Sequence, residues 1–81
     1  MLINERTPNS RIYIGNKLKE LRKKNGLTEK ELGTYLGISQ QQVSRYERGI
    51  NCVNVDLLAK LSELFQVPVK IFIPSDNVIL K

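Results

Sequence analysis

The side chains of this sequence best suited to recognition chemistry are polar and lie close together. They are Gln40, Gln41, Gln42, Ser44, Arg45 and Arg48. Glutamine can bond adenine through N6 and N7, and arginine can bond guanine through O6 and N7. If residues 40–48 form a helix, Val43 and Tyr46 face inward and the polar set shares the exposed face. This pattern favours a helix that reads base edges in the major groove of DNA over a polar helix that serves only solubility.

Other kinds of chemistry lack the residues that they need. The 81 residues contain no histidine, one cysteine, Cys52, and no glycine-rich phosphate loop. A conventional zinc site or a histidine-based acid–base centre requires side chains that are missing. We therefore expect no enzyme, no bound metal and no cofactor. Cys52 is interpreted as a small loop residue, because nothing near it in the sequence would activate its thiol as a redox sensor.

Positive charge is concentrated at the start of the chain. Residues 1–24 hold seven basic and two acidic residues, which accounts for the whole net charge of +5. This excess fits a polyanionic partner and a solvated basic helix face equally well. The single cysteine and the absence of an N-terminal signal peptide predict a reducing, cytoplasmic location. Apolar runs of at most three residues predict no membrane span.

The polar set must be positioned by two short helices joined by a tight turn. Thr28 and Glu31 have the spacing of a capping box, which predicts the start of one helix. Ser39 and Gln42 have the same spacing and predict a second capping box, which opens the helix over 40–48. Two helices at this spacing are typical of a helix-turn-helix unit.

Glycines and apolar residues complete the predicted unit. Gly37 and Gly49 are expected to end its two helices, where the backbone needs a positive φ. Gly33 is small enough to let the two helix axes approach closely. The expected core between them is Leu32, Leu36, Ile38, Val43 and Tyr46.

Further helices are expected on both sides of the unit. Ser10 is predicted to cap a first helix that ends at Gly26, and Asn54 to cap a fourth. Pro68 fits the start of a short fifth helix, although the alternating pattern over 67–73 suits a strand equally well. The expected organisation is a flexible lead, 1–9, one domain, 10–73, and a short extended C-terminal tail, 74–81.

The sequence from Ile14 to Phe72 resembles the Cro/C1-type (XRE) helix-turn-helix family. The matching motifs are Ile14-Gly15, Leu18, Leu21-Arg22, Gly26-Leu27-Thr28, Glu31-Leu32, Leu36-Gly37-Ile38-Ser39, Val43-Ser44 and Glu47-Arg48-Gly49. The resemblance implies an all-α, compact five-helix domain that binds operator DNA, usually as a dimer on a palindromic site. The segment 39–49 also resembles a narrower group, the MrpJ-type regulators of fimbrial operons, which repress motility genes.

The resemblance also implies roles for individual side chains. The expected base-reading residues are Gln40, Gln41, Ser44 and Arg45. Thr28 and Arg48 fall where the family contacts phosphates. Gln42 and Asn51 are expected as further phosphate contacts, Asn51 because the basic residues that the family often has after Gly49 are missing here. Glu29 also falls where the family contacts phosphates, but the family often has Gln there, and an acid would face the phosphates. Arg22 and Glu47 match a partly buried ion pair that ties the first helix to the third.

Together these features predict a sequence-specific regulator of transcription that binds double-stranded DNA, acts as a repressor and forms a homodimer. The expected dimer surface is more apolar than a solvated chain end requires: Val69, Ile71, Ile73, Val78, Ile79 and Leu80. The alternative is that these residues close the core of the monomer. A rival function is an antitoxin-like module that binds a toxin protein and controls its own gene. An RNA-binding adaptor is disfavoured, because only Tyr13 and Tyr35 are expected to be exposed for base stacking.

Overall fold

The apolar stripe of the first helix forms the centre of the molecule. In the computed structural model, which describes residues 10–74, helix α1 spans Ser10–Lys24 and buries Ile14, Leu18 and Leu21. Ser10 is itself the first helical residue, so its prediction as the N-cap is wrong. The predicted lead, 1–9, and the predicted tail beyond Pro74 lie outside the described residues.

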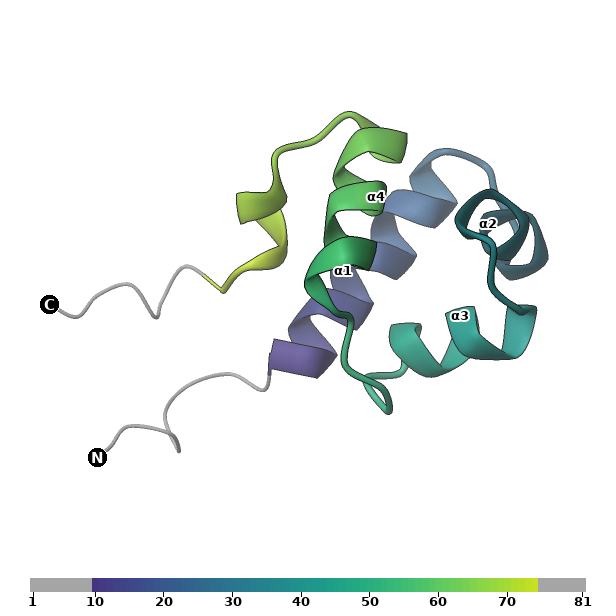
Figure 1. The fold of residues 1–81 in the computed structure, drawn as a ribbon, viewed down its shortest axis with the longest axis horizontal. Helices are drawn as coiled ribbons and strands as arrows, with labels where there is room; N and C mark the ends of the chain where they lie inside the picture. The colour runs from purple at the N-terminus through teal and green to yellow at the C-terminus, as the bar shows by residue number, and fades with distance from the viewer. Residues whose placement is uncertain (1–9, 75–81) are drawn as a thin grey trace, which may run out of the picture.

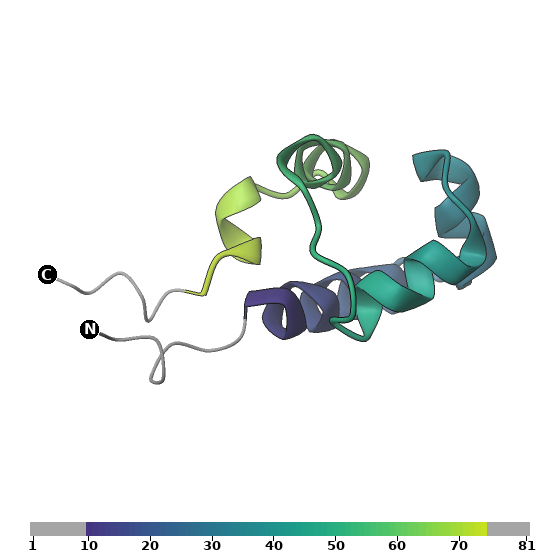
Figure 2. The same ribbon diagram turned by 60° about the horizontal axis from the view of Figure 1, so that its bottom comes forward.

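Helices α2 (Glu29–Leu36) and α3 (Gln40–Glu47) form the helix-turn-helix unit. They lie at one end of the molecule (Figure 1), and Figure 2 shows α3 running along α1. The turn between them is short, because Gly37 adopts a left-handed φ of 74° and Ser39 already caps α3. The predicted last residue of α3, Arg48, is its C-cap.

Helix α4 (Val55–Phe65) covers the core from the other side, and a short 3-10 helix, η1 (Val69–Phe72), closes it. Residues 10–74 therefore contain four α-helices, and the expected fifth helix is only this single 3-10 turn. Pro68 occupies its N-cap position and makes no side-chain cap hydrogen bond. The strand alternative for 67–73 is also wrong, because Val69–Phe72 form this 3-10 turn. All the regular structure described is helical.

The core is contributed by every element. Its buried members are Ile14, Leu18, Leu21, Leu32, Leu36, Val43, Val53, Leu57, Leu61 and Phe72. Burying a side chain of this size stabilises the fold by about 1.5–3 kcal/mol. Because α2 and α3 each supply members, the recognition unit is held on the same core as α1 and α4. None of the helices within residues 10–74 is long and apolar enough to cross a membrane.

All four helices end in the same backbone motif. After each helix a residue with positive φ reverses the chain, and the next residue donates its N–H back to the carbonyl five positions earlier. Examples are Leu27 to Arg22, Ile38 to Gly33 and Ile50 to Arg45, at 2.9–3.1 Å. The reversing residues are Gly26, Gly37, Gly49 and, after α4, Gln66 with a φ of 56°. Three ends matched the glycine signal, and the fourth uses a residue that gives no such signal.

Candidate nucleic-acid interface

Close backbone approaches set the position of α3. A Cβ atom on Gly15 of α1 would lie 2.6 Å from the carbonyl oxygen of Glu47, so only glycine allows α1 to approach α3 this closely. A Cβ atom on Gly33 of α2 would lie 2.7 Å from the carbonyl oxygen of Ile38, in the turn. Both neighbours are backbone atoms that cannot move aside cheaply. Gly15 therefore lets α1 pack closely against α3, and Gly33 lets α2 pack closely against the turn that leads into α3.

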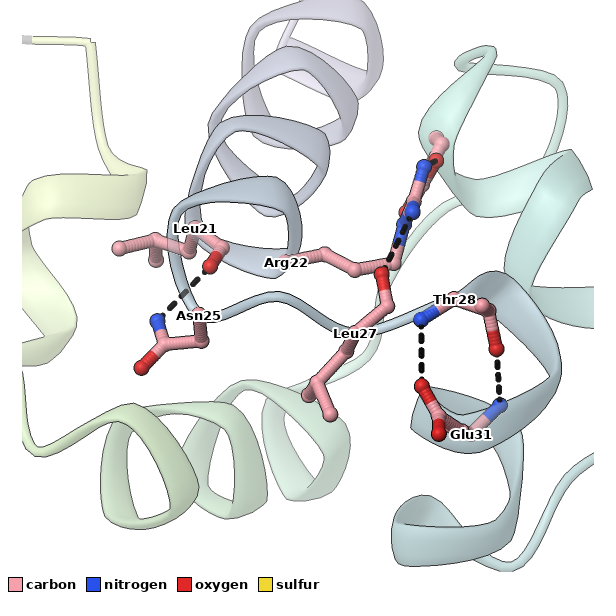
Figure 3. A network of polar contacts seen from close by, with 7 residues as sticks. Leu21, Arg22, Asn25, Leu27, Thr28 and Glu31 are labelled. Atoms are coloured by element: carbon pink, nitrogen blue, oxygen red, sulfur yellow. Dashed lines mark hydrogen bonds and ion pairs between the residues drawn. The ribbon is translucent and has the colours of Figure 1, made fainter.

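Arg22 and Glu47 join α1 to the inner side of α3. Nε and Nη2 of Arg22 donate to Oε2 and Oε1 of Glu47 at 2.6 and 3.0 Å, and both residues are buried. The remaining nitrogen, Nη1, donates to the carbonyl of Leu27 at 2.9 Å (Figure 3). The hydrogen bond to Glu47 raises the pKa of the Arg22 guanidinium above its ordinary value, against the opposing effect of burial. A paired and fully bonded arrangement of this kind costs several kcal/mol to break from one side.

The outer side of α3 carries the residues expected to read bases. Gln40, Gln41 and Arg45 are exposed, and Ser44 is half-buried beside them. Within residues 10–74, no hydrogen bond or ion pair engages the side chains of Gln40, Gln41 or Arg45. Their donors and acceptors are therefore available to a ligand, while Val43 and Glu47 fix the opposite side of the helix.

Gln42 does something that the sequence did not predict. One of the two bonds of the predicted capping box at the start of α3 is present: Ser39 Oγ accepts from the Gln42 N–H at 3.1 Å. The return bond from the Gln42 side chain is absent from the structure, so the prediction of a full second capping box is wrong. Instead, Gln42 Oε1 accepts from Asn51 Nδ2 at 3.1 Å. Two residues expected to contact phosphates separately are thus bonded to each other.

The start of α2 presents the other expected phosphate contact. Thr28 is exposed and caps α2 in a full capping box: its Oγ1 accepts from the Glu31 N–H, and its own N–H donates to Glu31 Oε1 (Figure 3). Arg48, at the other end of α3, is also exposed. Together with the exposed Arg45 of α3, these residues can offer hydrogen-bond donors and two positive side chains to an anionic backbone.

Glu29, the first residue of α2, is half-buried near Glu47. Burial and the nearby Glu47 carboxylate raise the pKa of Glu29. Arg22 and Lys19 act in the opposite direction and do not cancel the rise. The Glu29 side chain therefore interacts with the charged side chains of Glu47, Arg22 and Lys19, and it also lies next to Thr28 in the chain.

The structure also places Cys52 and the two tyrosines, Tyr13 and Tyr35, that were expected to be exposed. Cys52 is exposed in the loop between α3 and α4 and forms no disulfide. Tyr13 was expected to be outward, but it packs against the core and its hydroxyl donates to the Ile71 carbonyl at 3.3 Å. Tyr35 is 65% exposed, as expected. In residues 10–74 there is no group of three metal-binding side chains of the His, Cys, Asp or Glu type.

The fold defines a class of protein, the helix-turn-helix proteins. A helix-turn-helix family model matches residues 18–72, which is more than half of the chain. The chain belongs to the Cro/C1-type (XRE) helix-turn-helix family, as its sequence motifs indicated.

Two curated relatives are also named as helix-turn-helix proteins. An uncharacterized HTH-type transcriptional regulator of Sinorhizobium medicae is 36% identical over 73 residues, covering 89% of this chain and 52% of its own length. The HTH-type transcriptional regulator ImmR of Bacillus subtilis is 38% identical over 65 residues, covering 80% of this chain and 51% of its own length. The chain thus spans about half the length of these curated relatives. Both are named as regulators rather than as enzymes.

Two solved structures share the fold. The gene regulator ClgR of C. glutamicum superposes with a TM-score of 0.73 at 26% identity, covering 89% of this chain and 96% of the other. The restriction-modification controller protein C.AhdI of Aeromonas hydrophila gives a TM-score of 0.68 at 26% identity, covering 75% of this chain and 92% of the other.

Proposed function

We propose that this protein is a sequence-specific, double-stranded DNA-binding regulator that acts as a repressor and inserts α3 into the major groove. The observation that carries the proposal is the division of α3 into two sides. Val43 and Glu47 fix the inner side, whereas Gln40, Gln41 and Arg45 are exposed and unpaired within the described residues. Side chains of these types on a helix that enters the groove discriminate bases by paired hydrogen bonds.

The remaining polar residues support the docking of α3. We assign Ser44 to the base-reading set, and Thr28, Gln42, Arg48 and Asn51 to phosphate contacts, which fix the register of the helix but carry no sequence information. The net charge of +5 favours approach to a polyanion. The narrower similarity of 39–49 to MrpJ-type regulators stays a prediction, as does repression rather than activation.

Selection from a pool of random duplex DNA tests the proposal directly. We expect enrichment of one motif with a palindromic arrangement of half-sites, centred about 10–10.5 base pairs apart. Binding to the selected duplex should exceed binding to an unrelated duplex at every salt concentration, and both should weaken as salt rises. A pool that emerges without enrichment, or equal affinity for all duplexes, would contradict sequence-specific recognition.

Homodimer formation follows from the need for two half-sites. A single α3 reads too few base pairs for a regulator, and a twofold axis doubles the readout. Within the described residues, Val69 and Ile73 are 41% and 47% exposed, so η1 leaves apolar surface uncovered. Residues 78–80, the other part of the expected dimer surface, lie outside the described residues. Sedimentation of the full chain beside a chain truncated after Ile73 tests the prediction, because only the full chain should dimerise at micromolar concentration.

A further inference from the structure

The hydrogen bond between Gln42 and Asn51 connects the exposed side of α3 to the loop that follows it. The two residues are nine positions apart, both are half-buried, and Asn51 Nδ2 lies 3.1 Å from Gln42 Oε1. Gln42 is the third residue of α3, and Asn51 comes after the helix has ended. The bond therefore joins the first turn of the helix that is proposed to enter the groove to the loop that follows that helix.

The backbone of this loop is tied to α3 independently of the Asn51 side chain. Ile50 N–H and Asn51 N–H both donate to the carbonyl of Arg45, at 2.9 and 3.4 Å, and Gly49 supplies the left-handed turn. Val53, two residues further on, is buried in the core. The backbone at Asn51 is therefore held in place, which keeps its side chain close to Gln42.

The direction of the bond decides what Gln42 offers to a ligand. An amide side chain has one carbonyl acceptor and one NH₂ group with two donors. Because Asn51 donates to Oε1 of Gln42, and Nε2 of Gln42 makes no hydrogen bond within residues 10–74, both Nε2 donors are left for a ligand. A phosphate oxygen accepts hydrogen bonds only, so this is the orientation that a phosphate requires and that an unrestrained amide adopts only part of the time.

We propose that Asn51 is a positioning residue: it fixes the Gln42 amide with Nε2 outward, so that Gln42 donates to a single DNA phosphate at the start of α3. This inference rests on the proposed function and deepens it, because it replaces two independent phosphate contacts by one prepared contact. Gln42 contacts the phosphate, and Asn51 acts through Gln42. The pair restricts the side chain before DNA arrives, which lowers the entropy lost on binding.

A double-mutant cycle tests the inference with the selected duplex and an unrelated duplex. Gln42→Ala should weaken binding about 10-fold, as expected for the loss of a hydrogen bond to a charged group. Asn51→Ala should weaken it less, because the released Gln42 amide still presents Nε2 part of the time. The double variant should bind like Gln42→Ala, because Asn51 acts only through Gln42. The loss should be equal on both duplexes, and the salt dependence should stay unchanged, because neither side chain is charged.

Asn51→Asp provides the isosteric variant. A carboxylate accepts hydrogen bonds only, so it would bond Gln42 Nε2 and turn Oε1 toward the DNA, and binding should fall further than in Asn51→Ala. Asn25→Ala is the matched control: Asn25 also donates one side-chain bond, to the Leu21 carbonyl at 2.8 Å, but it lies beside Leu64 and Phe65. This control should lower the melting temperature and leave DNA affinity unchanged.

Each outcome separates the inference from the proposed function. Additive losses in the cycle, or wild-type affinity of Asn51→Ala, would overturn the positioning role while leaving DNA binding intact. A loss confined to the melting temperature would make the bond merely structural and would equally overturn it. Failure of the unmodified protein to bind any duplex would overturn the proposed function, and this inference with it.

Discussion

The helices α2 and α3 begin with the same sequence signal and use it differently. At α2 the box is closed in both directions, by Thr28 and Glu31. At α3 only the Ser39 half is made, and Gln42 turns away to Asn51. The polar side chains that start α2 are used to stabilise it, whereas one of those that start α3 is redirected toward the surface proposed to meet DNA.

This difference suggests how a small domain divides its polar residues. α2 can use its own side chains for its own stability, because its role is to hold α3 in place. α3 obtains its stability from its inner side, through Val43, Glu47 and the close approach at Gly15. Its remaining side chains are thereby released for recognition. Four predictions test this division, beginning with the largest expected effect.

Removing the Glu47 carboxylate should show that α3 is held mainly by the contacts of its inner side. Glu47→Ala leaves the buried guanidinium of Arg22 without its carboxylate, which costs about 3–5 kcal/mol. Thermal and urea unfolding should both report the loss, and the control Glu63→Ala, at an exposed position of α4, should unfold like the parent. A Glu47→Ala protein as stable as the parent would show that the anchor of α3 lies elsewhere.

Changing the outer side of α3 should weaken DNA binding and leave the stability of the fold unchanged. Gln41→Ala should leave the melting temperature unchanged, because the side chain is exposed and unpaired within residues 10–74. It should cost about 1–3 kcal/mol of binding at one base pair and relax the preference there. Binding titrations against duplexes with single base-pair changes measure this. Equal weakening on all duplexes would instead make Gln41 a backbone contact, and unchanged binding would remove it from the interface.

Substitutions at the capping residues of α2 and α3 compare the starts of the two helices directly. Thr28→Ala and Ser39→Ala should each destabilise by about 1 kcal/mol, because each side chain satisfies one backbone N–H. The third-position changes should differ: Glu31→Ala removes the second bond of a box and lowers the melting temperature, whereas Gln42→Ala removes none of the bonds at the start of α3. Equal losses from Glu31→Ala and Gln42→Ala would show that the two starts are used alike.

The same contrast explains how far the sequence predicted the structure. Local signals were reliable: the box at Thr28, the cap at Asn54 and the ends at Gly26, Gly37 and Gly49 all depend on neighbours within a few residues. Gln42 was placed wrongly because a partner nine residues away outcompeted the local bond. Tyr13 was misplaced for a similar reason, since its partner lies in η1.

Other features had no local signal of their own. Gln66 adopts a left-handed φ because the bond from the Val67 N–H to the Ser62 carbonyl requires the reversal, whatever residue stands there. Arg22 and Glu47 are 25 residues apart, and only the family resemblance suggested that they meet. The base and phosphate contacts remain predictions, because they concern a ligand outside the chain.

The smallest expected difference between the helix starts is electrostatic, and it concerns their first residues, Glu29 in α2 and Gln40 in α3. Burial and the neighbouring Glu47 carboxylate raise the pKa of Glu29 in the folded protein. The folded state then holds a proton more tightly than the unfolded chain. As pH rises from the ordinary carboxyl range through the raised pKa, the contribution of Glu29 to stability therefore falls.

Glu29→Gln should abolish this fall, because an amide does not titrate. The variant and the parent should differ least at low pH, where the carboxyl is protonated in both states. The variant should gain in relative stability as pH rises toward 7, and thermal unfolding over that range measures the gap. Glu63→Gln, at an exposed position, is the matched control and should follow the parent. The opposite result, a parent that becomes the more stable protein near pH 7, would mean that the dipole of α2 and the cations Arg22 and Lys19 favour the ionised acid more strongly than its burial beside Glu47 disfavours it.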